Sequence, residues 1–395
     1  MPPGRTAARR AEQRAVARDR LFASALPAAF AAGLVATAAP ILVGTGAFAA
    51  PGGAYGGGDP ARTVLTIAWA GDITPGSRYG VSPASGRALF TAVRRDLEAP
   101  DLTVGNLEGT LARGGSSKCG ASDGGNCFSF RAPPGHAAGL AWAGFDAMNL
   151  ANNHSLDFGP GAQRETIAAL HRRGLAHTGT PGRIAMLERR GVRVALLGFA
   201  PNAGVADLRD IAGARRLVRT AARHADVVVV TMHAGAEGVR AIHVPRGREQ
   251  AFGGDRGNTR AFAHAVVDSG ADLVLGSGPH VLRGMERYRG RLIAYSLGNF
   301  AGWKNFARGG LLSLSGLLTV SVTGTGEVLG RADAAAAPGG ARRAPARPLR
   351  RRGTPGGPPR ARRLRPACRP PARRRHDPLN SACGGRVRPR QEVMP

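Results

Sequence analysis

The segment Asn149–Gly159 concentrates side chains that could bind a metal ion. It reads NLANNHSLDFG, so amides, an imidazole and a carboxylate follow an apolar run at 145–150. That run predicts a buried strand, and open α/β sheets bind their ligands at the ends of such strands. Amide, imidazole and carboxylate groups are all ligands of hard or borderline cations. Taken alone, the segment fits equally well an Asx-rich turn that leads into a helix at 160–173.

Four further apolar runs end in the same kinds of polar side chain. They are 64–70 before Asp72, 102–104 before Asn106 and Glu108, 227–230 before His233, and 272–275 before His280. Five strands that each deliver such a group at one end are hard to explain by chance, so we expect the groups to meet in one site. These residue types build two-metal hydrolytic centres, in which two divalent ions clamp a phosphoryl group and activate water.

Individual roles follow from the chemistry of each group. Such a centre needs a bridging carboxylate, which Asp72 or Glu108 could supply. A mixed set of nitrogen and oxygen ligands suits Mn, Zn or Fe better than Ca. We expect Asn153 to be a ligand, and its neighbour His154 to donate a proton or to stabilise charge.

The rest of the chain from Arg62 to Gly330 alternates strand-like and helix-like segments, which predicts an α/β fold. Helices are expected at 84–97, 160–173, 206–224 and 258–269, and additional strands at 192–199 and 292–295. The segment 311–328 reads as a terminal β-hairpin that turns at 323–326.

The N-terminus is similar to an export signal. Residues 1–20 are basic, residues 21–50 carry no charge, and Ala47-Phe48-Ala49 has the small-x-small pattern of a cleavage site. The uncharged run is also long enough to span a bilayer, so a cleaved signal and an N-terminal anchor both remain open. Either would place the protein outside the cytoplasm, and the Gly-rich segment 51–61 reads as a linker.

The C-terminal segment 331–395 differs in character from the rest. It holds 18 Arg against Asp333, Asp377 and Glu392, and it has no periodic apolar pattern. Such a segment cannot bury enough surface to offset its conformational entropy, so we expect disorder. A frameshift in a GC-rich gene would produce this composition, and a basic arm for anionic wall polymer is the alternative. Since the tail offers no aromatic side chains for bases to stack on, we expect no nucleic-acid partner.

Cys119 and Cys127 flank a short Gly-rich loop. In an oxidising compartment a disulfide between them is expected, whereas a zinc site would need a second Cys or His pair nearby.

The strand-end motifs also resemble a known family. GDI at 71–73, GNLE at 105–108, NLANNHSLDFG at 149–159, HAGAE at 233–237 and the run from Gly276 to Phe300 resemble the CapA family of capsule, or poly-γ-glutamate, synthesis proteins. The resemblance covers about residues 62–330. It implies a four-layer α/β/β/α sandwich like that of the calcineurin-like metallophosphatases, with metal-binding loops at the strand ends.

The resemblance assigns roles residue by residue. It implies metal ligands at Asp72, Glu108, Asn153, His233 and His280, with His154 as the catalytic group. Residues expected to contact substrate or to support the ligands are Asn106, Asn152, Asp157, Glu237, Tyr295 and Asn299.

Two positions depart from the family pattern. Thr74 stands where metallophosphatases carry a histidine, and Gly278 stands where the last motif often carries a second one. Glycine has no side-chain ligand, so one ion or two could be bound.

The resemblance implies an exported protein of capsule or poly-γ-glutamate biosynthesis or export. Its metal cleft would either hydrolyse or only hold an anionic polymer or phosphoryl substrate, beside membrane synthase or export partners. Two alternatives are a secreted metal-dependent phosphoesterase unrelated to capsule and a basic module that coats wall polymer through its tail.

Overall fold

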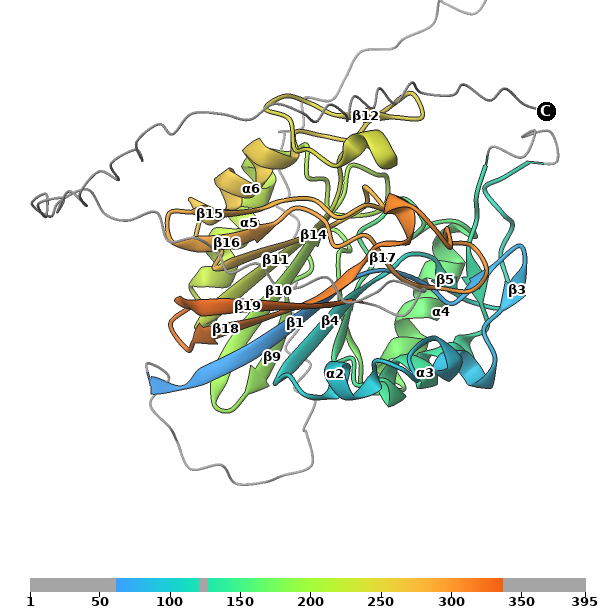
Figure 1. Cartoon of the computed structure of the whole chain (residues 1–395), viewed down its shortest axis with the longest axis horizontal. Helices are drawn as coiled ribbons and strands as arrows, with labels where there is room; N and C mark the ends of the chain where they lie inside the picture. The colour runs from blue at the N-terminus through green and yellow to red at the C-terminus, as the bar shows by residue number, and fades with distance from the viewer. Residues whose placement is uncertain (1–61, 121–126, 337–395) are drawn as a thin grey trace, which may run out of the picture. The chain divides into compact units, whose positions relative to one another are not determined.

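The computed structural model describes residues 62–120 and 127–336. Two large sheets face each other, with α5 (Ile211–Ala222) and α6 (Thr259–Val267) on one side and α2 (Arg94–Glu98), α3 (Ala137–Trp142) and α4 (Gly159–His171) on the other (Figure 1). The expected four-layer α/β/β/α arrangement is therefore confirmed.

The first sheet has seven strands in the order β19-β18-β1-β4-β7-β8, with β17 also paired to β1. Strands β1, β4, β7 and β8 run parallel, so their carboxyl ends share one edge. The bounds are β1 Val64–Thr74, β4 Leu102–Leu107, β7 Ala147–Asn149, β8 Ala176–Thr178, β17 Asn299–Gly302, β18 Gly316–Thr323 and β19 Val328–Ala336.

The second sheet has six strands in the order β15-β16-β14-β11-β10-β9. Its four central strands, β16, β14, β11 and β10, are parallel. The bounds are β9 Ala185–Arg189, β10 Val192–Phe199, β11 Val227–His233, β14 Leu273–Ser277, β15 Met285–Tyr288 and β16 Arg291–Ala294.

The period-2 alternation of the strands produces three buried layers. In β10, Val194 and Leu196 point between the sheets, while Ala195 and Leu197 point toward α5 and α6. The outer face of the first sheet packs in the same way on α2, α3 and α4. Trp69 of β1 is fully buried between the sheets, and its indole N–H donates to the carbonyl of Gly276, 3.0 Å away. The two sheets are thereby held in register at the ends that carry the site.

A β-bulge in β1 aims Asp72 at the site. The pairing with β4 shifts between Ala70 and Asp72, and the amide of Asp72 donates to the carbonyl of Gly298 at 3.0 Å. A Cβ at Gly71 would lie 2.1 Å from that same carbonyl oxygen, so only glycine permits this close approach.

Short elements complete the described fold. They are β2 Gly76–Ser77, β3 Gly80–Val81, β5 Thr110–Leu111, β6 Arg131–Ala132, β12 Gln250–Ala251, β13 Gly254–Asp255 and the 3₁₀ turns η2 Ala84–Leu89, η3 Pro134–His136, η4 Val239–Ala241 and η5 Leu311–Ser313.

Two expected boundaries were wrong. The helix expected at 84–97 divides into η2 and α2, because the φ angles of −117° at Phe90 and −118° at Val93 depart from the helical value. Within η2, Ser85 and Gly86 also adopt positive φ angles of 53° and 91°. The expected tail boundary at Gly330 falls inside β19, which pairs with β18 as far as Ala336, so the hairpin is longer than expected.

The expected signal or anchor, the linker and the tail beyond Ala336 lie outside the described residues. Within 62–120 and 127–336, no helix is long and apolar enough to cross a membrane.

Candidate metal centre

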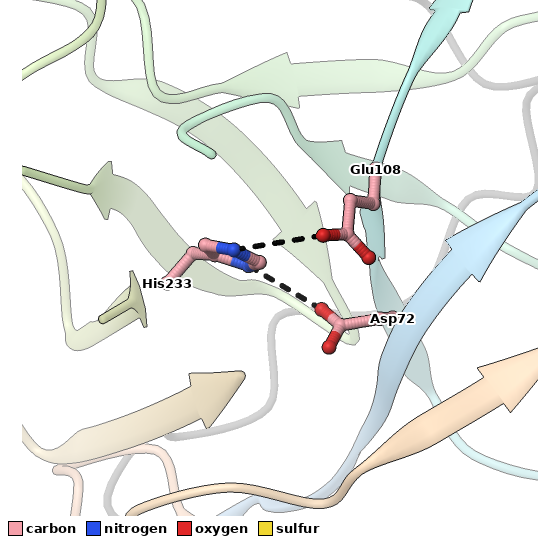
Figure 2. A group of neighbouring side chains, drawn as sticks. All are labelled: Asp72, Glu108 and His233. Atoms are coloured by element: carbon pink, nitrogen blue, oxygen red, sulfur yellow. Dashed lines mark ion pairs between the residues drawn. The ribbon is translucent and has the colours of Figure 1, made fainter. Parts of the chain in front are cut away.

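Three fully buried ionisable side chains meet where the two sheets end. Asp72 lies on β1, Glu108 follows β4, and His233 ends β11, so both sheets contribute (Figure 2). Their potential ligand atoms all lie within 4.8 Å of one another. Figure 2 shows the imidazole of His233 facing both carboxylates, with Nδ1 3.4 Å from Asp72 Oδ1 and Nε2 3.7 Å from Glu108 Oε1.

Glu108 is the centre of a larger set. The Nε2 atoms of His154, His233 and His280 each lie 3.7 Å from its Oε1. His280 also approaches Asp72, with Nδ1 3.1 Å from Oδ2. Three other strand-end segments of the sequence therefore converge on the Glu108 carboxylate.

Buried atoms without hydrogen bonds mark this place as suited to a cation. Both carboxylate oxygens of Glu108 and Nε2 of His233 are buried without a hydrogen-bond partner. Buried polar atoms are normally paired, because an unpaired one costs free energy. Two ligands about 2.0–2.2 Å from one ion lie no more than about 4.4 Å apart, and the contacts around Glu108 Oε1 meet that limit. The donors present thus fit a divalent cation.

Electrostatics also favours a cation. Burial and the charge of Asp72 raise the pKa of Glu108 well above its usual value. Burial opposes a charged His280, but Glu108 and Asp72 outweigh it and raise its pKa to about 10. Burial lowers the pKa of His233 to about 4, although Asp72 opposes this shift. Burial also disfavours a charged Asp72, but its hydrogen bonds to the two histidines prevail and lower its pKa. Without metal, the cluster retains protons that a divalent ion would displace.

Metal affinity is therefore expected to rise with pH. A folded-state pKa of about 10 keeps His280 protonated at neutral pH, and a ligand must lose that proton. Each proton released strengthens the apparent affinity about tenfold per pH unit, so at least that slope is expected between pH 6 and 8. Titration of metal-free protein with Mn²⁺ at several pH values would measure it, and an affinity independent of pH would contradict the assignment of His280 as a ligand.

Asn106 holds Asp72 and His233 in place. Its Nδ2 donates to Asp72 Oδ1 at 2.7 Å and lies 3.1 Å from His233 Nδ1. Its Oδ1 accepts hydrogen bonds from Asn149 at 2.8 Å and Asn152 at 3.2 Å. Because Nδ1 of His233 also lies 3.2 Å from the hydroxyl of Ser277, Nε2 is the nitrogen left facing Glu108. Such supporting contacts orient metal ligands.

Sequence reasoning did not assign Asn149 or Ser277 to the site. Both are strand-terminal polar residues with no exposed surface, at the ends of β7 and β14. Their positions within the motifs at 149–159 and 276–300 were the available signal.

His154 faces Glu108 and is oriented by Asp157. Its Nδ1 donates to Asp157 Oδ2 at 2.8 Å. Burial lowers the pKa of His154, although Asp157 opposes this shift. The imidazole is therefore neutral at neutral pH, and its Nε2, 3.7 Å from Glu108 Oε1, can accept a proton before it donates one.

Lys118 supports this pair. Its ammonium group lies 2.6 Å from Asp157 Oδ1 and donates to the carbonyl of Asn153 at 2.9 Å. The next residue, Cys119, is joined to Cys127 by a disulfide.

His280 is held in an uncommon backbone conformation. Its φ is 58°, which costs about 1–3 kcal/mol for a residue other than glycine. Its Nδ1 lies 2.8 Å from Asn299 Oδ1, so Nε2 faces the cluster, 3.6 Å from Glu237 Oε2. Glu237 in turn forms a 2.9 Å ion pair with the buried Arg256, which sequence reasoning missed.

The departures from the family pattern have structural explanations. A Cβ at Gly278 would lie 2.8 Å from the amide nitrogen of Ala234, and its φ of 109° also favours glycine. The hydroxyl of Thr74 accepts a hydrogen bond of 2.6 Å from Asn305. In the described part of the chain, this hydroxyl forms no hydrogen bond with Asp72, Glu108 or His233.

The expectation for Tyr295 does not fit its position. Its side chain belongs to the layer between the second sheet and its helices, where the hydroxyl donates to Glu286 at 2.7 Å. It follows Ile293 on the outward face of β16, whereas Ala294 faces the first sheet.

A buried ion pair anchors the loop that carries Glu237 and Arg256. Arg283 and Glu249 are 0% and 2% exposed, and their closest atoms lie 2.7 Å apart. The same guanidinium donates to the carbonyls of Ala241 and Ala236.

Arg283→Met is expected to lower the free energy of unfolding by about 3–5 kcal/mol, because it leaves the Glu249 carboxylate buried without its partner. Urea unfolding would measure the loss. The double variant Arg283→Met/Glu249→Leu should recover part of it, and a single variant as stable as the wild type would show that the pair does not anchor the loop.

Comparisons with known proteins identify a family and relatives of the chain. A family model described as "Bacterial capsule synthesis protein PGA_cap" matches residues 66–302. The chain is 29% identical over 263 residues to "PGA biosynthesis protein CapA" of Bacillus subtilis, which covers 61% of this chain and 64% of that protein. It is 30% identical over 269 residues to "Capsule biosynthesis protein CapA" of Bacillus anthracis, covering 60% and 61%. The matches thus span less than two thirds of these relatives.

Among solved structures, a phosphatase from Mycoplasma pneumoniae aligns with a TM-score of 0.44 and 13% identity over 69% of this chain and 93% of that one. Since the family model spans more than half of the sequence, including the strand ends that carry Asp72, Glu108, His233 and His280, the chain belongs to the bacterial capsule synthesis protein family PGA_cap.

Proposed function

We propose that the protein is a metal-dependent hydrolase of capsule or poly-γ-glutamate biosynthesis. The observation that carries this proposal is the set of buried, unpaired ligand atoms around Glu108. The ligands would be Asp72, Glu108, Asn153, His233 and His280, which would hold one or two ions of Mn, Zn or Fe.

The chain's own groups suit a hydrolytic reaction. A divalent ion in this place would act as a Lewis acid and make water a stronger nucleophile. His154, oriented by Asp157, would take up a proton on Nε2 and return it to the leaving group. Asn106 would keep Asp72 and His233 in position, and Asn299 would do the same for His280.

The polymer and the location are also proposed. The names of the Bacillus relatives, which concern PGA and capsule biosynthesis, support an anionic capsule polymer as the substrate. The uncharged segment 21–50 and the disulfide between Cys119 and Cys127 support a place outside the cytoplasm, secreted or anchored, beside membrane synthase or export partners.

The test is a comparison of substrates. Full-length protein loaded with Mn²⁺ would be incubated with poly-γ-glutamate, with a phosphorylated capsule precursor mixture and with a generic phosphodiester. Turnover of a capsule substrate that is lost with a chelator is expected. Efficient hydrolysis of the generic phosphodiester alone would favour a secreted phosphoesterase, and metal binding without turnover of any substrate would refute the hydrolase assignment.

A further inference from the structure

A cavity of about 510 Å³ is lined by arginines. Arg78 follows β2, Arg113 follows β5 and Arg131 begins β6, and the wall also includes Ser129 and Phe158. Sites for small molecules typically measure about 300–1,000 Å³, so the cavity could hold a short segment of a chain and not only a single ion.

The three guanidinium groups have no carboxylate partner. In the described parts of the chain, none of them forms an ion pair, and the lining contains no Asp or Glu. Glu165 is nearby, but it accepts a hydrogen bond from the backbone amide of Arg113. The cavity therefore holds positive charge that is not neutralised locally.

Arg131 is held in place by uncharged contacts. Its guanidinium carbon lies 4.2 Å from the ring centroid of Phe158, and Nη1 lies 3.4–3.5 Å from the carbonyl oxygens of residues 113–115. Arg78 donates to the hydroxyl of Tyr79 at 2.7 Å. These contacts orient the groups without satisfying their charge, which leaves them available to an anionic ligand.

Two residues that line the cavity are sequence neighbours of residues that contact His154. Phe158 directly follows Asp157, and Ser129 directly precedes Phe130. The Phe130 ring lies 4.3 Å from the ring of His154, and its backbone amide donates to Asp157 Oδ2 at 2.6 Å. A chain bound along the arginines would thus lie against the segments that orient His154.

We infer that this cavity binds successive carboxylates of an acidic polyglutamate chain and so positions the chain beside the metal centre. This inference rests on the proposed function and adds a second, separate contact between the protein and the polymer. Arginine suits this task because its planar fork binds a carboxylate through two hydrogen bonds. Three such groups spread over the cavity match a ligand with several negative charges.

The test measures binding of a fluorescent oligo-γ-glutamate to full-length, Mn²⁺-loaded protein. The double variant Arg78→Gln/Arg131→Gln is compared with Arg215→Gln/Arg219→Gln, which removes two exposed arginines from α5 on the outer face of the second sheet. We expect at least about tenfold weaker binding for the cavity variant, less than twofold for the control, and a smaller salt dependence for the cavity variant.

Metal content and turnover of each variant separate this inference from the proposed function. Unchanged binding by the cavity variant would overturn the cavity assignment and leave the metal centre untouched. Binding of inorganic polyphosphate in preference to the oligoglutamate would overturn the ligand class. A wild type that binds the oligomer at the arginines but holds no metal would refute the proposed function alone. Should the double variant fail to fold, the exposed single variants Arg78→Gln and Arg113→Gln make the same test.

Discussion

Glu108→Gln is expected to weaken divalent metal binding at least 100-fold while it raises the stability of the metal-free protein. The carboxylate is fully buried and has no hydrogen-bond partner, and the charge of Asp72 opposes its ionisation. Loss of a supporting contact already costs about 10–100-fold in metal affinity, so loss of a central ligand should cost more. An amide needs no proton to stay neutral in this site, so the variant should stabilise the metal-free protein by about 1–3 kcal/mol at neutral pH, since one unit of pKa shift corresponds to about 1.4 kcal/mol.

The stability difference between the wild type and Glu108→Gln is expected to change with pH in one direction. Because the folded-state pKa of Glu108 is raised, its contribution to stability is present below the unfolded pKa and is lost as the pH rises. The advantage of the glutamine variant in Tm should therefore be larger at pH 8 than at pH 4.5. Glu188→Gln, at an exposed position on β9, is the control and should change neither quantity. A less stable glutamine variant with normal metal content would show that Glu108 has a structural role instead.

His154→Asn is expected to lower turnover about 10²–10⁴-fold with the metal retained, because it removes the proton-transfer group and leaves the ligands in place. Its Nε2 faces the cluster, but its other nitrogen is committed to Asp157. Turnover and metal content would be measured on the same preparations, with the exposed His224→Asn as the control. Loss of metal together with turnover would mean that His154 is itself a ligand.

Much of the arrangement follows from local patterns. The apolar runs that end at Asp72, Glu108, His233 and His280 are strands, and parallel strands bring their carboxyl ends to one edge. A polar residue directly after such a run therefore predicts a place in the site without knowledge of the tertiary structure.

The side of a sheet to which a side chain points, and the geometry of the loops, could not be predicted in the same way. Period-2 alternation shows that Tyr295 and Ala294 point to opposite sides of the sheet, but only the packing of the two sheets decides which side is inward. The loop that brings Glu237 to His280 depends on Arg256 and on the Arg283–Glu249 pair, which no periodic pattern connects. Likewise, Asn149 is placed by its bond to Asn106, a residue 43 positions earlier.

The most direct test of the account is the metal content of the full-length protein, measured by mass spectrometry after mild purification and reconstitution with Mn²⁺ or Zn²⁺. Wild type would be compared with Asp72→Ala and His280→Ala. We predict one to two equivalents in the wild type and their loss in both variants. A wild type that retains no metal, or variants that bind it as well as the wild type, would contradict the assignment of this cluster as a metal centre.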